Sequence, residues 1–223
     1  MLVRLVWFAM ARSIIVTFGW TESPVIGAIV RHGFEPGDRI ILLKPVDRDE
    51  RAEKAISDLR AFLSNLAGVE LVEKEVEVRS FVDAVIAIKR LLDRERLNRN
   101  VIVNLSGGMR ILVLAAYLAS LFTRNVKLEI ETENRKVWTA LPSINISQLS
   151  RLKRNHVRIL RLLQISKGVS SVRDLLSALK LPRSTFYACV RDLKDMELVE
   201  SYGKGLLKIT DKGNLLTILL GGW

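Results

Sequence analysis

The chain has 223 residues, of which 49% are hydrophobic, and its 35 Lys and Arg residues against 24 Asp and Glu residues give a formal net charge of +11. A chain of this size and hydrophobic content can bury a core, which excludes a disordered basic tail. The chain has a single cysteine, Cys189, and two histidines, which excludes a disulfide scaffold and a Cys-based zinc cluster. We therefore expect a reducing, cytoplasmic location and no metal site. The charge predicts an anionic partner, for which nucleic acid, a nucleotide and a membrane surface are all candidates.

No stretch of the sequence is expected to span a membrane. The longest apolar runs, residues 111–122 and 2–10, are shorter than the roughly 18 residues that a spanning helix needs. The amino-terminal charge and short apolar run are features of a signal peptide, but Arg12 interrupts the run and a predicted strand follows it. A further interpretation is that residues 1–9 are an extension ahead of a natural start at Met10.

Strands and helices alternate over the first 141 residues, as hydrophobic periodicity and turn residues indicate. Strands are predicted at residues 12–18, 39–46, 71–78 and 101–105, helices at 22–31, 47–66, 81–97 and 109–122, and a closing hairpin at 126–131 and 137–141. Strands separated by helices of this length predict βαβ units. We therefore expect an α/β domain with a mainly parallel sheet that is covered on both faces.

The pattern changes after Pro142. Helices are predicted at residues 147–166, 171–179 and 184–195, followed by β-like runs at 198–202 and 206–210 and an apolar segment at 213–220. We place a linker at residues 142–150, between a first domain (1–141) and a second domain (151–223). Residues 148–223 hold 14 basic and 6 acidic side chains, whereas residues 1–147 hold 21 and 18, so most of the excess charge lies in the smaller domain.

Residues 171–195 have the pattern of a helix-turn-helix, in which Pro182 ends the first helix and Ser184 caps the second. The second helix of such a unit enters the major groove, and the hairpin that follows here resembles a wing. The residues expected to contact double-stranded DNA are Arg183, Ser184, Thr185, Tyr187, Arg191 and Lys194 on the helix and Tyr202, Lys204 and Lys208 on the wing. The region resembles the winged-helix domains of prokaryotic transcription regulators, although a protein-interaction module with a solvated basic face is the alternative.

The two histidines are assigned structural roles. Arg151 and His156 have the spacing of the Arg…His motif in HEPN-type ribonucleases, and a histidine on a basic helix can act as a general base. The same stretch is, however, the expected first helix of the winged domain. His32, beside Gly33 in a loop, is expected to be a surface or capping residue.

The most informative stretch of the first domain runs from Val101 to Arg110, where a strand ends, two glycines follow a serine and an apolar helix begins. Glycines allow a ligand to approach the backbone, and the unpaired N–H groups of a helix start favour an anion. The candidate phosphate-binding residues are Ser106, Gly107, Gly108, Met109 and Arg110. The loop lacks the Lys-Ser/Thr of a P-loop and the GxGxxG of dinucleotide enzymes, and a plain βα turn is the alternative.

The first strand also ends in a small polar loop, formed by Thr17, Phe18, Gly19, Trp20 and Thr21. Ligands of open parallel sheets bind beyond the carboxyl ends of the strands, where the winding direction switches, and the loops after the first and fourth strands would meet there in a doubly wound sheet.

Two acidic residues follow the glycine loop by about twenty positions, as a ribose-binding acid would. They are Glu129 and Glu131. The alternation along residues 126–131 also explains them as the outer face of an edge strand.

Both loops and the appended second domain together resemble the CARF–winged-helix regulators of archaeal CRISPR systems, in which CARF denotes a CRISPR-associated Rossmann-like fold. The resemblance extends from about residue 12 to the wing. It implies a symmetric homodimer that binds a cyclic oligoadenylate, most often cyclic tetra-adenylate, as an effector, with no cofactor. Carried onto this sequence, the ligand-binding residues are Thr17, Gly19, Trp20, Thr21, Ser106, Gly107, Gly108, Met109 and Arg110. Trp20 would either stack on adenine or lie in the dimer interface.

The sequence thus predicts a ligand-responsive, DNA-binding transcription regulator without catalytic residues. The alternative from another class is a ring nuclease that slowly cleaves the cyclic nucleotide, for which Ser106 and Arg110 could position a ribose hydroxyl. A third interpretation is an interaction scaffold that binds neither ligand nor DNA.

Overall fold

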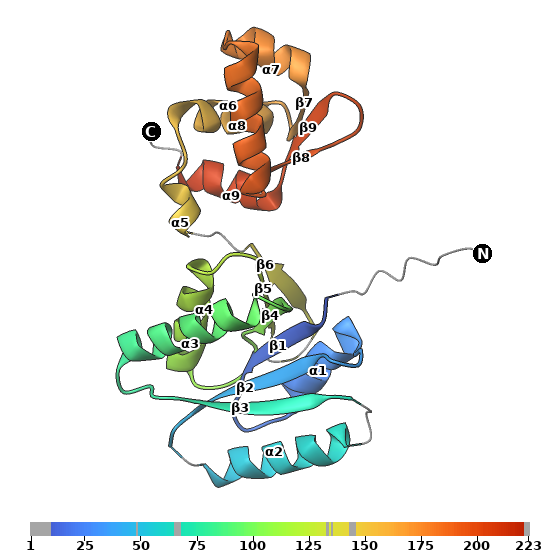
Figure 1. The fold of residues 1–223 in the computed structure, drawn as a ribbon, viewed down its shortest axis with the longest axis vertical. Coiled ribbons are helices and arrows are strands. Elements are labelled where there is room, and N and C mark those ends of the chain that lie inside the picture. Colours follow the sequence, from blue (N-terminus) through green and yellow to red (C-terminus); the bar gives the residue numbers. More distant parts are fainter. Residues whose placement is uncertain are drawn as a thin grey trace, which may run out of the picture. The chain divides into compact units, whose positions relative to one another are not determined.

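The structure, a computed structural model, describes residues 10–47, 49–64, 68–132, 134, 136–142 and 146–220. The predicted extension at residues 1–9 lies outside these ranges. The chain folds into two compact units, Met1–Ser143 and Ile144–Trp223 (Figure 1). Within the described ranges, no helix has the length and apolar content that crossing a bilayer requires.

The first unit is built on a sheet of six strands in the order β3-β2-β1-β4-β5-β6. The strands are β1 (Arg12–Thr17), β2 (Arg39–Pro45), β3 (Glu70–Val76), β4 (Asn100–Asn104), β5 (Val126–Glu131) and β6 (Trp138–Leu141). The first five are parallel, and β6 pairs antiparallel with β5, with Leu128 opposite Leu141. The predicted mainly parallel sheet with a closing hairpin is confirmed.

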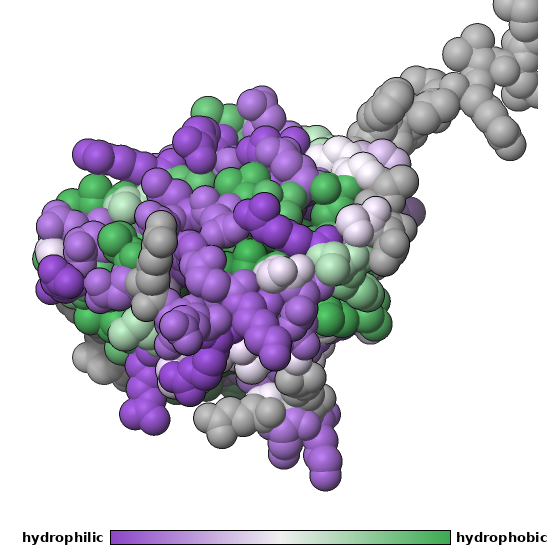
Figure 2. Space-filling view, turned by 90° about the horizontal axis from the view of Figure 1, so that it is seen from below, coloured by the Kyte–Doolittle hydropathy of each residue, from purple (hydrophilic) through white to green (hydrophobic). Residues whose placement is uncertain are grey.

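Helices cover both faces of this sheet (Figure 1). They are α1 (Ser23–His32), α2 (Glu50–Leu63), α3 (Phe81–Glu95) and α4 (Arg110–Leu121). Because successive side chains of a strand point to opposite faces, Ile14 and Val16 pack in a core with α1 and α2, whereas Ile15 packs in a core with α3 and α4. Figure 2 shows that the outer side of α2 is mainly hydrophilic, as expected for an amphipathic helix.

The sheet switches its winding direction between β1 and β4. The chain runs outward from β1 to β2 and β3, returns to lay β4 against the other side of β1, and then continues outward to β5. The loops after β1 and β4 therefore lie side by side at the carboxyl edge of the sheet, which is the position where ligands bind in such folds.

The second unit combines helices with a small antiparallel sheet of strand order β7-β9-β8. Its elements are α5 (Ile146–Leu149), α6 (Arg154–Ile165), β7 (Val169–Ser171), α7 (Val172–Leu179), α8 (Arg183–Asp195), β8 (Val199–Ser201), β9 (Leu206–Ile209) and α9 (Asp211–Leu219). Helices α6, α7 and α8 enclose a core that includes Leu160, Leu179 and Phe186. The β8–β9 hairpin projects from this core as a loop (Figure 1).

Two predicted boundaries in this unit are wrong. The single helix predicted at residues 147–166 is split into α5 and α6, because Lys153 has extended backbone angles of φ −108° and ψ 165°. Helix α8 begins at Arg183 with Pro182 as its N-cap, so Ser184 already lies inside the helix and does not cap it. Strand β7 has too few residues to show a periodicity in the sequence.

Candidate functional site

A cavity of about 540 Å³ opens where the loops after β1 and β4 meet. It brings together eight of the nine residues that the sequence marks as ligand-binding. The lining residues are Gly19, Trp20, Thr21, Pro24, Ser106, Gly107, Gly108, Met109, Arg110, Glu131 and Thr132. Pro24 and Thr132 were not predicted, whereas Glu131 was considered as a ribose-binding acid.

Thr17 is the one predicted ligand-binding residue that is absent from this lining. Its side chain is fully buried, and its hydroxyl donates a hydrogen bond to the carbonyl oxygen of Asn104 at 3.3 Å. Thr17 therefore joins the ends of β1 and β4 beneath the cavity, and the expected contact between its side chain and a ligand is not supported.

The glycines of the two loops allow the loops to pack directly against each other. A Cβ atom on Gly107 would lie 2.8 Å from the carbonyl oxygen of Thr17, and one on Gly108 would lie 2.9 Å from that of Phe18. Gly108 also has a φ of +85°, which disfavours any residue with a side chain. The sequence predicted close approach of the backbone to a ligand, whereas the structure shows a close approach of one loop to the other.

The start of α4 forms one wall of the cavity. Met109 is the N-cap residue, but its side chain makes no capping hydrogen bond, and the first turn contains no acidic residue. The amides of this turn and the exposed side chain of Arg110 are therefore available to an anion. This arrangement can bind a phosphate group at the cavity wall.

Trp20 forms another wall and is held from the side of α2. Its indole N–H donates to the Oδ2 atom of Asp49 at 2.9 Å, and the guanidinium of Arg51 lies 4.1 Å from the centre of its ring. The side chain is 58% exposed and also borders a second cavity of about 240 Å³, together with Met109. This exposure suits Trp20 both as a stacking partner for a base and as an interface residue.

Ser106 is fixed by strand β5. Its hydroxyl oxygen accepts a hydrogen bond from the amide of Glu131 at 2.9 Å, and the Glu131 carboxylate forms an ion pair with Arg31 of α1. The sequence left Glu131 either as a ribose-binding acid or on the outer face of a strand, and its position at the cavity depends on β5 lying next to β4 in the sheet.

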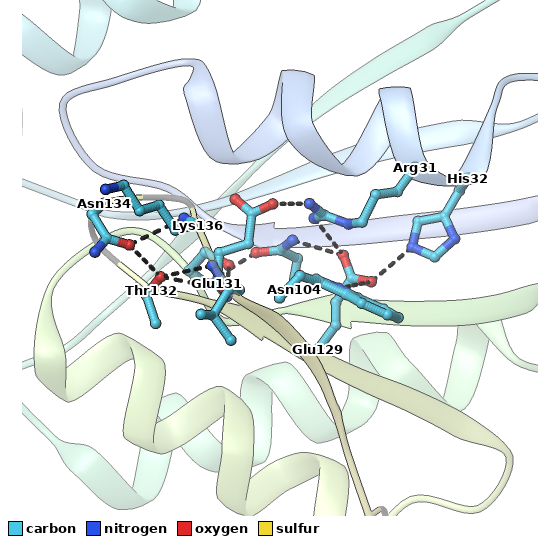
Figure 3. A network of polar contacts seen from close by, with 11 residues as sticks. Arg31, His32, Asn104, Glu129, Glu131, Thr132, Asn134 and Lys136 are labelled. Carbon is cyan, nitrogen blue, oxygen red and sulfur yellow. Dashed lines mark hydrogen bonds and ion pairs between the residues drawn. The ribbon is translucent and has the colours of Figure 1, made fainter.

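Glu129 is the centre of a buried polar network beneath the cavity (Figure 3). Its carboxylate, 2% exposed, accepts hydrogen bonds from Asn104 Nδ2 at 2.7 Å and Trp138 Nε1 at 3.2 Å, and it lies 2.7 Å from His32 Nε2. Burial raises the pKa of this carboxyl group, but the hydrogen bonds with His32 and Asn104 outweigh burial and leave the pKa below its ordinary value.

This network corrects two expectations. Glu129 does not lie on the outer face of an edge strand, because β5 is flanked by β4 and β6 and the carboxylate is buried. His32 is not a plain surface or capping residue, because its ring contacts that carboxylate.

The residues predicted to contact DNA lie on α8 and the β8–β9 hairpin. Phe186, Val190 and Leu193 of α8 are buried, whereas the exposed predicted residues are Arg183, Ser184, Tyr187, Arg191, Lys194, Tyr202 and Lys204. Thr185 and Lys208 are partly buried. Lys194 donates to Ser201 Oγ at 2.6 Å, and Lys208 pairs with Glu200 at 3.2 Å, so these two ammonium groups already have partners.

His156 has a structural position at the start of α6. Its side chain is 1% exposed, and Nδ1 accepts the backbone N–H of Lys153 at 2.9 Å. Burial lowers the pKa of its imidazole, although Asp192, whose Oδ2 lies 3.5 Å from Nε2, raises it. This burial and helix-start role agree with the structural assignment rather than with a ribonuclease motif.

Solved structures that resemble this chain include distant ones. Protein VC1899 from Vibrio cholerae is 14% identical, with a TM-score of 0.46, and the match covers 93% of this chain and 64% of that protein. Two variants of RuvB from Thermotoga maritima are each 12% identical, with a TM-score of 0.27, and the matches cover 92% of this chain and 86% of theirs. No curated protein matches the sequence.

A family model covers most of the first unit. Residues 12–142 match the family described as the Csa3 CRISPR-associated Rossmann-like domain. The match spans all six strands of the sheet and both cavity loops. The chain belongs to the Csa3 family of CRISPR-associated Rossmann-like domains.

Proposed function

We propose that this chain is a transcription regulator of a CRISPR system that senses a cyclic oligoadenylate, with cyclic tetra-adenylate as the preferred ring. The observation that carries the proposal is the cavity that unites the loops after β1 and β4 with the uncapped start of α4 in a CRISPR-associated Rossmann-like domain. The ring would be the effector, and promoter DNA the target of the second unit.

The lining of the cavity suits a phosphodiester. The Gly107 and Gly108 amides, the Arg110 guanidinium and the hydroxyls of Ser106 and Thr21 supply donors and positive charge along one cavity. A ring of four nucleotides carries four negative charges and two-fold symmetry. A cavity of about 540 Å³ accommodates part of such a ring, so a second chain would bind the remainder.

A homodimer is supported by the outer face of α4. Leu114 and Tyr117 of α4 are 58% and 38% exposed, and Phe122, the C-cap residue of this apolar helix, is 43% exposed. Exposed apolar stripes of this kind mark protein interfaces. A two-fold axis near the start of α4 would present two copies of Arg110 to a symmetric ligand.

DNA binding is assigned to the second unit. Its net charge is +8 over residues 148–223, and α7 and α8 are followed by a hairpin, as in a winged helix. The exposed start of α8 carries Arg183 and Ser184, with Arg191 further along the helix. These residues would contact bases and phosphates in the major groove, and Tyr202 and Lys204 would contact the adjacent backbone.

Substitution of Arg110 tests the sensing role. Arg110→Ala is expected to weaken binding of cyclic tetra-adenylate about tenfold or more, because a charge-assisted contact to phosphate is lost. Binding to a promoter fragment in the absence of the ring should not change. The matched control is Arg124→Ala, which removes the same charge beyond the other end of α4. Absence of ring binding by the wild-type protein would overturn the sensing proposal.

Ring cleavage is the competing activity at the same cavity. The Ser106 hydroxyl accepts the Glu131 amide and keeps its proton free for a ligand oxygen, which is the geometry a positioned ribose hydroxyl would need. Prolonged incubation of the protein with labelled cyclic tetra-adenylate distinguishes a sensor from a ring nuclease. Recovery of intact ring supports a sensor, whereas accumulation of linear product supports a ring nuclease.

A further inference from the structure

Glu129 places a negative charge beneath a cavity that we assign to an anion. Burying a carboxylate is costly even when it is paired, and an apolar residue at such a position is often as stable. The carboxylate is nevertheless 2% exposed and has contacts with four side chains (Figure 3). These are Arg31, His32, Asn104 and Trp138. Stability alone therefore does not explain this arrangement.

Asn104 connects Glu129 directly to the glycine loop. Its Nδ2 donates to Glu129 Oε1 at 2.7 Å, which turns its Oδ1 toward the backbone N–H of Ser106 at 2.9 Å. A carboxylate can only accept from Asn104, so the charge of Glu129 determines which way the amide is turned. By accepting the Ser106 backbone N–H, the Asn104 side chain in turn fixes the path of the loop after β4.

The Glu129 carboxylate also contacts α1, the helix that follows the loop after β1. Arg31 and His32 form the last turn of α1, the helix that begins directly after the Gly19–Thr21 loop. Arg31 Nη2 lies 3.3 Å from Glu129 Oε1, and the same guanidinium pairs with Glu131. Glu129 thus links both loops of the cavity through two different elements.

We propose that Glu129 is a positioning residue for the nucleotide site: it holds the loops after β1 and β4 in the ligand-binding arrangement before any ligand arrives. It touches no ligand itself and acts through Asn104 and through α1. Such preorganisation increases affinity because the loops need not be ordered on binding. The identity of the ligand rests on the proposed function, whereas the ordering of the loops does not.

A reciprocal exchange tests this role. Asn104→Asp places two carboxylates together in a buried site and should weaken binding of cyclic tetra-adenylate about tenfold or more. In the double variant Asn104→Asp/Glu129→Gln, the introduced glutamine can donate to the introduced aspartate, which still accepts the Ser106 amide. Affinity should then return to within about threefold of wild type.

The matched control is Ser13→Ala at the amino-terminal end of β1, whereas the cavity lies at the carboxyl ends of the strands. Ser13 is fully buried, and its hydroxyl donates to the buried Glu95 at 2.8 Å, so its loss also removes a hydrogen bond to a buried carboxylate. This variant should be less stable yet bind the ring like wild type. Equal loss of affinity in Ser13→Ala would overturn the proposal, because general destabilisation would then explain the effect.

Amide hydrogen exchange of the ligand-free chains gives a readout that needs no ring. Exchange of residues 104–110 should be faster in Asn104→Asp and return to the wild-type rate in the double variant. Unchanged exchange in Asn104→Asp, or a double variant that restores neither exchange nor affinity, would overturn the positioning role. If Asn104→Asp does not fold, the double variant is compared with wild type and with Ser13→Ala alone. Failure of wild type to bind the ring would contradict only the proposed ligand.

Discussion

A Cβ atom on Gly19 would lie 3.0 Å from the amide nitrogen of Gly108. These two glycines belong to loops that are separated by about ninety residues in the chain, and both line the cavity. The site is therefore formed by backbone contact between two strand ends, and a methyl group on either side is expected to push the loops apart.

Gly108→Ala should destabilise the first unit through two effects. The positive φ costs about 1 kcal/mol or more, and the close contact with Phe18 adds to it. Gly33→Ala in the same unit is the matched control, because Gly33 has a φ of +68° but nothing within 4 Å of the added Cβ. Denaturant unfolding should show a larger loss for Gly108→Ala than for the control. Equal losses would mean that the contact between the loops is unimportant.

Trp20 tests whether the ring is bound by stacking. Loss of a stacking side chain costs about 1–3 kcal/mol per base, so Trp20→Ala should weaken binding of cyclic tetra-adenylate by about fivefold or more. Trp20→Phe keeps an aromatic face and should retain most of the affinity. Sedimentation of both variants decides between the two roles: an interface residue would change the dimer dissociation constant and leave ring affinity per dimer unaltered.

His156 is expected to make the second unit sensitive to acid. Its folded-state pKa is lowered, so the unfolded chain takes up a proton first as the pH falls below about 6.5, and stability decreases there. His156→Gln should remove this part of the pH dependence and keep the helix start, because glutamine suits the same capping position. Proton NMR of the two histidines checks the direction, and titration of the His156 ring at or above the ordinary value would contradict it.

Salt dependence tests the proposed DNA surface. The variants Arg183→Ala and Arg191→Ala should each reduce promoter affinity and, where a phosphate contact is lost, lower the slope of log K against log salt by about one. The control Lys54→Ala removes the same charge from the exposed side of α2 in the first unit. A control that weakens DNA binding as much as either variant would show that net charge alone is responsible.

The sequence predicted the sheet because its strands and helices repeat with clear periods, and the Ser106–Arg110 loop was recognisable from its glycines and the apolar helix after it. Glu129 could not be placed in the same way. Local alternation put it on an outer face, whereas strand order puts β5 inside the sheet and α1 brings His32 to it. Contacts between distant segments have no local signature.

In the second unit, a contact between residues only three positions apart was also not predictable from the sequence. Phe186 and Leu193 are seven residues apart on α8 and both are buried, as the apolar spacing of an amphipathic helix requires. The break between α5 and α6 was missed, because it depends on the extended backbone of Lys153 and on the His156 side chain that accepts its N–H. A polar contact of this kind leaves the hydrophobic period almost unchanged.

Calorimetric titration of the wild-type chain with cyclic tetra-adenylate, with linear tetra-adenylate as the control, tests whether the cavity binds a cyclic oligoadenylate. We expect saturable binding of one ring per two chains, with much weaker binding of the linear form. Absence of binding to cyclic tri-, tetra- and hexa-adenylate alike, at protein concentrations where the chain is dimeric, would contradict it.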